Sequence, residues 1–254
     1  MDATRVRDGR RVVLKKVLPV EGPHELQISQ MFSSAEVATN PHNHCVPLLE
    51  VIRLSENFGS QQLMVFPLLR PFNRPRIQTF GEFAGFFTQI CEARLNTLFS
   101  CVIAILIPHQ GMQFMHQRNV AHRYDWRPYP WRLKPNYFES DCTAANIIFS
   151  RSKPYLRGFL PDMNDRNRTF MGAVSAYMST RPAPRYYFID FGLSRRYPSR
   201  DVMDEPYPGG DESAPEHRPG RRLCNPFHTD VYYIGNLVRE EFMEVRDRVA
   251  CYHK

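Results

Sequence analysis

The chain has 254 residues, 43% of them hydrophobic and 13% aromatic, and a formal net charge of +7. This length suffices for one sizeable core or for two lobes around a cleft, and the composition excludes disordered, collagen-like and coiled-coil chains. No apolar run approaches the roughly 20 residues that cross a bilayer. For this reason no membrane partner is expected. The charged N-terminus, which has no apolar stretch, is also unlike a secretory signal. The six cysteines form no CxxC pair, which predicts an intracellular protein, cytoplasmic or nuclear.

The positive charge comes from arginine, with 28 Arg against 5 Lys. Nucleic acid and phosphoryl groups are the partners that such a charge permits. The arginines are spread along the chain rather than gathered in one run, which favours a solvated surface and disfavours nucleic acid as a partner. A nucleic-acid binder nevertheless remains an alternative, and it predicts an affinity that falls steeply with salt.

The first 70 residues predict mostly strands with one helix. Strands at residues 3–6 and 11–17 flank the hairpin dipeptide Asp8-Gly9. Residues 25–32 have apolar side chains at helical spacing and predict a short helix. Two further strands are expected at residues 46–52 and 63–66, separated by the polar turn SENFGSQQ.

After residue 71 the pattern becomes mainly helical. Phenylalanines at three- and four-residue spacing predict an amphipathic helix over residues 80–91, and residues 111–116 continue in the same style. Short buried strands are expected at 146–149 and 186–189, with a long irregular loop at 161–184 between them. Residues 230–242 predict a final helix.

Four short signals follow one another along the chain. The first is VVLK, an apolar strand ending in Lys15, whose ammonium needs a counter-charge or a phosphate. The second is His122-Arg123, followed after an interruption by Asp141 and Asn146. An Asp and an Asn five residues apart can orient a hydroxyl nucleophile and ligate a metal.

The third signal is DFG, in which Asp190 ends a buried strand where a divalent metal could compensate its charge. The fourth is APE, ending at Glu216, followed by DVYYIG from Asp230. Each signal alone has an ordinary structural explanation, such as an edge lysine or a turn. Their order along the chain makes them informative together.

In this order the signals resemble those of the protein kinase family. VVLK is similar to the VAIK strand, HR…DxxxxN to the catalytic loop, and DVYYIG to the opening of helix F, while DFG and APE stand unchanged. The resemblance covers most of residues 3–245, and NHCVPLLEVI and NPFHTDVYYIGNLVREEF resemble kinase-like proteins of fungi. It implies one α+β, two-lobed domain over 1–254, with a mainly β N-lobe (1–69) and a mainly α C-lobe (70–254).

The resemblance also implies ATP and Mg²⁺ as ligands and γ-phosphoryl transfer to a protein hydroxyl, serine or threonine by default. Lys15 would hold the α- and β-phosphates and pair with Glu25, or less readily with Glu36. Asn146 and Asp190 would bind Mg²⁺.

Two more groups of residues take roles from the same resemblance. Asp141 would be the catalytic base, in one loop with His122 and Arg123. Phe66 would line the adenine pocket, and Pro67 to Leu69 would form the hinge, where Pro67 offers a carbonyl although it has no N–H.

The sequence departs from the family pattern in several places. Strand one and the glycine-rich loop are missing, the chain ends soon after helix F, and the loop at 150–186 is long. Inserts at 93–110 and 124–140 interrupt a helix and the catalytic loop; they are either in-frame introns that were read through or surface loops. Asp125 is an alternative base, but it lacks an Asn five residues later.

These departures leave two outcomes open for the chain. One is an active kinase, and the other is a pseudokinase or truncated fragment that acts as a binding or scaffold protein. Serines and Tyr197 lie in the activation segment, where Arg123 could pair with a phosphate.

Overall fold

The computed structural model divides the chain into two compact units, Met1–Phe114 with Asn146–Gly192, and Met115–Ala145 with Leu193–Lys254. It contains both helices and strands, as the predicted α+β class requires. No helix in the described part of the chain is long and apolar enough to cross a membrane. The residues described are 1–17, 23–55, 61–72, 77, 79–91, 111–123, 146–150, 159–160, 163–167, 184–206, 214–215 and 223–243.

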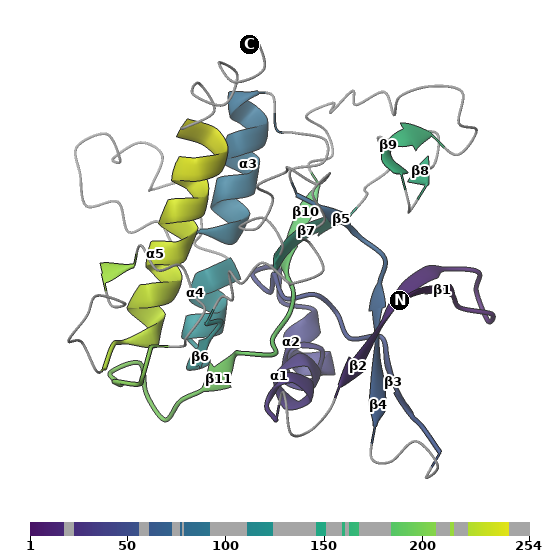
Figure 1. Ribbon diagram of the computed structural model, residues 1–254, viewed down its shortest axis with the longest axis horizontal. Helices are drawn as coiled ribbons and strands as arrows, with labels where there is room; N and C mark the ends of the chain where they lie inside the picture. Colours follow the sequence, from purple (N-terminus) through teal and green to yellow (C-terminus); the bar gives the residue numbers. More distant parts are fainter. Residues whose placement is uncertain are drawn as a thin grey trace, which may run out of the picture. The chain divides into compact units, whose positions relative to one another are not determined.

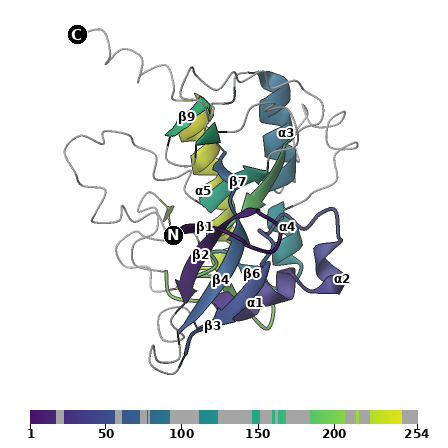
Figure 2. The same ribbon diagram turned by 90° about the vertical axis from the view of Figure 1, so that its right-hand side faces the viewer.

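The first unit contains a four-stranded antiparallel sheet in the order β1-β2-β4-β3 (Figures 1 and 2). Its strands are β1 (Asp2–Thr4), β2 (Arg11–Val17), β3 (Glu50–Arg53) and β4 (Gln62–Pro67). Gly9 lies in the loop between β1 and β2 with a φ of 66°, a conformation that glycine adopts without strain. In the sheet Lys15 stands opposite Met64.

Two short helices, α1 (Glu25–Phe32) and α2 (Ala35–Ala38), follow β2 in the chain. The apolar face of α1 is buried at Ile28 and Phe32. The Phe32 ring lies 6.2 Å from that of Phe114 and 5.9 Å from that of Phe191, centroid to centroid. This packing anchors the last turn of α1, and Glu25 is buried in the first turn of the same helix.

A second antiparallel sheet, in the order β10-β7-β5, carries the other part of the candidate site. It consists of β5 (Arg70–Pro71), β7 (Ile147–Ser150) and β10 (Arg185–Phe188). Helix α3 (Phe80–Ile90) begins with a capping box between Thr79 and Glu82, and packs against β10. The Phe86 ring stacks on Phe72 at 4.7 Å and meets Tyr186 edge-on at 5.1 Å.

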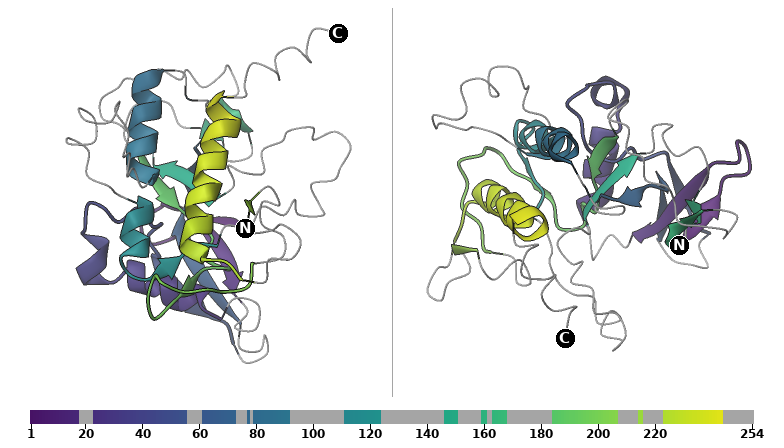
Figure 3. Two further views of the ribbon diagram at one scale, coloured as in Figure 1. Left: turned by 90° about the vertical axis from the view of Figure 1, so that its left-hand side faces the viewer. Right: turned by 90° about the horizontal axis from the view of Figure 1, so that it is seen from above.

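The second unit is built around α5 (Pro226–Val238), which runs unbroken in both views of Figure 3. Asn225 caps this helix by accepting a hydrogen bond from the Phe227 N–H at 3.0 Å. A π-helical turn, η5 (Arg239–Met243), continues it. Two short strands, β6 (Val120–Ala121) and β11 (Arg195–Arg196), pair antiparallel, and β6 contacts α5. Helix α4 (Gly111–His116) begins in the first unit and ends in the second.

Most of the predicted elements are confirmed, several of them to the residue. The strand predicted at 46–52 is wrong in its first half, because Val46 donates its N–H to the carbonyl of Phe188 in β10 and the strand β3 begins only at Glu50. The loop predicted at 161–184 is not wholly irregular, since it contains β9 (Met163–Asn167), which pairs with β8 (Phe159–Leu160) just before it. The last helix begins at Pro226 rather than at Asp230.

Candidate functional site

Three charged side chains of the first unit meet at Lys15. The Lys15 Nζ donates hydrogen bonds to Oε1 of Glu25 and to Oδ1 of Asp190, the latter at 2.7 Å. Lys15 and Asp190 stand 175 positions apart in the chain, Lys15 on β2 and Asp190 two residues after the end of β10. Of the two acidic partners considered for Lys15, the structure brings Glu25 to it, whereas Glu36 is exposed on α2.

The neighbouring charges shift the pKa values of Lys15 and Glu25. Burial by itself lowers the pKa of Lys15, but the charges and hydrogen bonds of Asp190 and Glu25 outweigh it, and the pKa lies above its ordinary value. Burial raises the pKa of the Glu25 carboxyl, against the opposing effect of Lys15. Two carboxylates lie around one ammonium. Carboxylate oxygens at a partly buried site are ligands that a divalent cation prefers.

The backbone at Asp190 is unusual for a residue with a side chain. Its φ is 64°, in the left-handed region that non-glycine residues seldom adopt. The conformation is held locally because the Gly192 N–H donates to Asp190 Oδ1 at 3.3 Å. A Cβ on Gly192 would lie 3.2 Å from that same oxygen, so the glycine makes room for the carboxylate. Residues held in such conformations cluster at functional sites.

Asn146 lies at the same end of the second sheet as Asp190. The Ile189 N–H donates to the Asn146 carbonyl at 3.0 Å, one position before Asp190. Carboxylate and amide oxygens are the donors that Mg²⁺ prefers, and the Asp190 side chain is 36% exposed, so an ion could approach it. Among the described residues no three His, Cys, Asp or Glu side chains gather as a metal site. Two protein oxygens with water or phosphate completing the shell is the arrangement usual for Mg²⁺.

The residues predicted to form the hinge follow β4 in the first unit. Phe66 and Pro67 end that strand, opposite Val13 and Val12 of β2. The Leu68 N–H donates to the carbonyl of Arg11 at 3.2 Å, so the chain stays against β2 beyond the proline. Phe66, Pro67 and Leu69 are all half-buried, which leaves part of each available for contact.

In the second unit, Asp230 holds the backbone of the His122-Arg123 segment. Its buried carboxylate accepts the N–H of His122 through Oδ2 and that of Arg123 through Oδ1, both at 2.7 Å. The His116 Nε2 atom lies 3.1 Å from Oδ2. Arg123 has a φ of 56°, another left-handed conformation at a residue with a side chain. The Ser194 hydroxyl donates to the His122 carbonyl at 2.9 Å.

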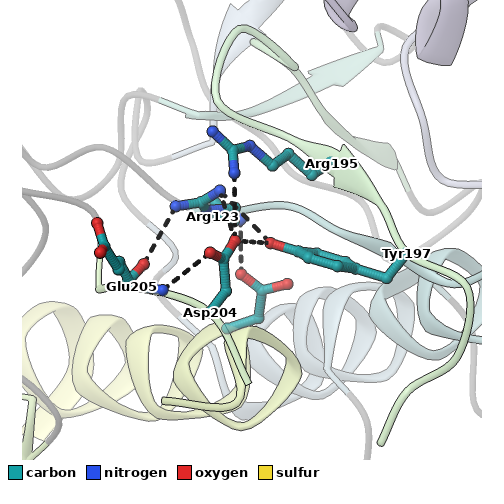
Figure 4. A network of polar contacts seen from close by, with 6 residues as sticks. Arg123, Arg195, Tyr197, Asp204 and Glu205 are labelled. Atoms are coloured by element: carbon teal, nitrogen blue, oxygen red, sulfur yellow. Dashed lines mark hydrogen bonds and ion pairs between the residues drawn. The ribbon is translucent and has the colours of Figure 1, made fainter. Parts of the chain in front are cut away.

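The Arg123 guanidinium belongs to a polar network around Asp204 (Figure 4). Arg123 Nη1 and Arg195 Nη1 lie 3.2 Å and 3.3 Å from Asp204 Oδ2, and the Tyr197 hydroxyl donates to the same atom at 2.6 Å. Oδ1 accepts the Glu205 N–H at 2.8 Å. Burial alone would raise the pKa of the Asp204 carboxyl, but the hydrogen bonds from Tyr197 and Glu205 and the two arginines outweigh it and lower this pKa.

Several sequence predictions lie outside the described residues. These are the base Asp141, its alternative Asp125, Glu216 of the APE signal, and both inserts, 93–110 and 124–140. The roles of these residues stay predictions.

The sequence did not predict the structural roles of two residues, Asp204 and Asp230. Asp230 was noted only as the first letter of DVYYIG. Its position on the buried face of an amphipathic helix was the available signal, because a buried carboxylate needs donors. Nothing in the sequence around Asp204 distinguished it from its exposed neighbour Asp201.

Comparison with known proteins adds no assignment. The chain matches none of the models of known protein families, and it has no significant match among curated proteins.

Proposed function

We propose that this protein is a protein kinase-like phosphotransferase that binds Mg²⁺·ATP and transfers the γ-phosphoryl group to a protein hydroxyl. The observation that carries the proposal is the meeting of Lys15, Glu25 and Asp190 from three separate parts of the chain. The order of the VVLK, DFG and APE signals supports it, as do the small antiparallel sheet and the helix that present Lys15 and Glu25.

The proposed tasks of Lys15, Glu25 and Asp190 are supported by their contacts, whereas that of Asp141 rests on the sequence. Lys15, oriented by buried Glu25, would bind phosphate oxygens, and Asp190 with Asn146 would hold Mg²⁺. The bound metal would neutralise charge on the phosphates. Asp141 would accept the proton of the substrate hydroxyl. The side chains bind and orient, which is most of what phosphoryl transfer requires of a protein.

The test is Mg²⁺·ATP binding by the whole chain, measured by calorimetry, with Lys15→Met and Asp190→Asn as variants. Each removes a charge-assisted contact worth about 1.5–3 kcal/mol, so affinity should fall roughly 10- to 150-fold. Lys16→Met is the matched control, because Lys16 is the exposed neighbour of Lys15 on the same strand. Equal affinity in wild type and Asp190→Asn would refute the proposal.

A second measurement separates catalysis from binding alone. Transfer of labelled γ-phosphate to a generic protein acceptor is compared between wild type, Asp141→Asn and Asp125→Asn. Loss in Asp141→Asn alone identifies the base, and loss in Asp125→Asn alone identifies its alternative. Binding without transfer in the wild type supports instead the non-catalytic, partner-binding protein that the split catalytic loop of the sequence leaves open.

A further inference from the structure

A cavity within the first unit lies between the chain that follows α1 and the strand β10. Its volume is about 190 Å³, more than the roughly 150 Å³ that holds a benzene molecule inside a protein. Every described residue that lines it belongs to the first unit. Its apolar lining includes Phe32, Cys45 and Pro47. A concave site with apolar lining and a few polar groups is the usual form of a small-molecule site.

Arg185 brings a positive charge to this cavity. It is the first residue of β10, and the alternation of a strand places Tyr187 on the same face. The Arg185 guanidinium lies 5.8 Å from the centre of the Tyr187 ring. Its Nη2 atom donates to the backbone carbonyls of Pro41 and Asn43 at 3.1 Å and 3.0 Å. These contacts hold the guanidinium in place without neutralising its charge.

The lining offers hydrogen-bond donors and one positive charge. Among the described residues, no carboxylate forms an ion pair with Arg185, and no Asp or Glu lines the cavity. Thr39 and Asn40 also line it and carry a hydroxyl and an amide. The Asn40 Oδ1 atom accepts the His42 N–H at 2.9 Å, which leaves the NH₂ group as a donor. An anionic group placed here would therefore gain charge-assisted hydrogen bonds.

The side chain of Asn43 fixes the wall of the cavity. Asn43 is 5% exposed, and its Nδ2 atom donates to the carbonyls of Phe32 and Val37 at 2.8 Å and 3.2 Å. Its Oδ1 atom accepts the Cys45 N–H at 3.1 Å. One buried amide thus joins the end of α1, the helix α2 and the chain beyond them. A wall that is already ordered loses little entropy when a ligand binds.

We propose that this cavity binds a small monocarboxylate whose apolar body has about the size of one aromatic ring. The carboxylate contacts the Arg185 guanidinium, and the body covers Phe32 and Pro47. An inorganic anion would leave these apolar side chains uncovered, and a neutral ring would leave the guanidinium without a counter-charge. The inference does not depend on phosphotransfer, and its test measures no activity.

The experiment is a titration of the whole chain with benzoate and with benzamide, followed by saturation-transfer NMR of the ligand. The two probes share ring and size, but only benzoate is charged. Benzoate should bind about ten-fold more tightly, because only its carboxylate gains a charge-assisted contact with Arg185. Arg185→Gln should weaken benzoate binding about ten-fold and leave benzamide binding unchanged. Arg185→Lys keeps the charge and should still prefer benzoate.

Two controls separate this site from the general attraction of a basic protein for anions. Arg53→Gln makes the same charge change at an exposed position of β3 in the same unit, and it should bind benzoate like wild type. Irradiation with azidobenzoate, followed by peptide mass spectrometry, locates the bound ring. The label should fall within residues 32–47 or 185–187, which contain the described lining of the cavity.

Any of three results overturns the proposal. They are benzoate that binds no better than benzamide or not at all, benzoate affinity that is unchanged in Arg185→Gln, and a label outside the two segments. If Arg185→Gln does not fold, the wild-type preference for benzoate and the position of the label decide together. Both as expected support the proposal, and failure of either overturns it.

Discussion

Replacing Asp230 by Asn should destabilise the second unit strongly although the side chain keeps its size. Asp230 Oδ1 accepts the Arg123 N–H and Oδ2 accepts the His122 N–H, with His116 Nε2 at 3.1 Å. An amide has one accepting oxygen and one donating NH₂ group. One of the two backbone N–H groups therefore faces a donor after the substitution.

The expected cost follows from these contacts. A buried donor without a partner costs about 1–3 kcal/mol, and each hydrogen bond to a charged acceptor contributes about 1.5–3 kcal/mol. Since one bond survives in weaker, neutral form, Asp230→Asn should cost about 3–5 kcal/mol, as is usual when one partner of a buried charged group is changed. In a chain of this size the thermal midpoint should fall by roughly 6–20 °C.

The assay is urea unfolding followed by circular dichroism, with the slope against urea compared between variants. An unchanged slope with a lower midpoint means lost stability rather than a changed unfolded state. Asp201→Asn, at an exposed position, should stay within about 0.5 kcal/mol of wild type. If Asp230→Asn also stays within about 1 kcal/mol, the carboxylate does not hold the His122-Arg123 backbone in the way argued.

Three further predictions follow from the same structure. Lys15→Met and Glu25→Gln should show a coupling of about 0.5–3 kcal/mol in a double-mutant cycle of unfolding free energies, because the two side chains form an ion pair. If the effects of the two substitutions simply add, the ion pair is contradicted. The pKa of Asp204 is lowered in the folded state. Its carboxylate therefore contributes fully to the free energy of unfolding above the ordinary carboxyl pKa of 3.8, and this contribution is lost as the pH falls through the pKa of the folded state. The difference in thermal midpoint between wild type and Asp204→Asn should therefore be constant above about pH 5 and shrink on further acidification; a difference that grows instead would contradict the shift. Gly111→Ala should destabilise the protein by about 1–3 kcal/mol in urea unfolding, since the added Cβ would lie 2.7 Å from a backbone oxygen. Gly85→Ala has open space around it and a helical backbone, so it should stabilise the protein by about 0.5–1 kcal/mol. Equal effects of the two substitutions would show that the neighbours of Gly111 move aside at no cost.

Sequence alone predicted the elements whose pattern is local. The strand β2 and the helices α1, α3 and α4 begin and end within one residue of the expected bounds. Apolar spacing, the cap at Thr79 and turn glycines act within a few residues, so they can be read without knowing what the element packs against.

Pairing between distant segments was decided by the tertiary structure. Residues 46–49 have the composition of a strand, yet Val46 bonds to Phe188 of β10, and contact with β4 begins only at Leu49, whose N–H donates to the Val65 carbonyl. The choice of partner depends on which edge is within reach after the chain has folded, and a local pattern does not contain that information.

For the candidate site too, some contacts were predicted from the sequence and others were decided by the tertiary structure. The resemblance that the short signals support predicted Lys15, Glu25 and Asp190 as a set, but it left Glu36 open as the partner of Lys15. Tertiary packing settled the contact, because buried Phe32 positions α1 with Glu25 toward Lys15, while Glu36 is exposed on α2.

The contacts of Asp204 and Asp230 were decided entirely by the tertiary structure. They meet Arg123 across 81 and 107 positions of the chain, and no local pattern links residues so far apart. A carboxylate looks alike in sequence whether water or two arginines surround it. What distinguishes these two is the set of hydrogen-bond donors around each, and only the folded chain brings those donors together.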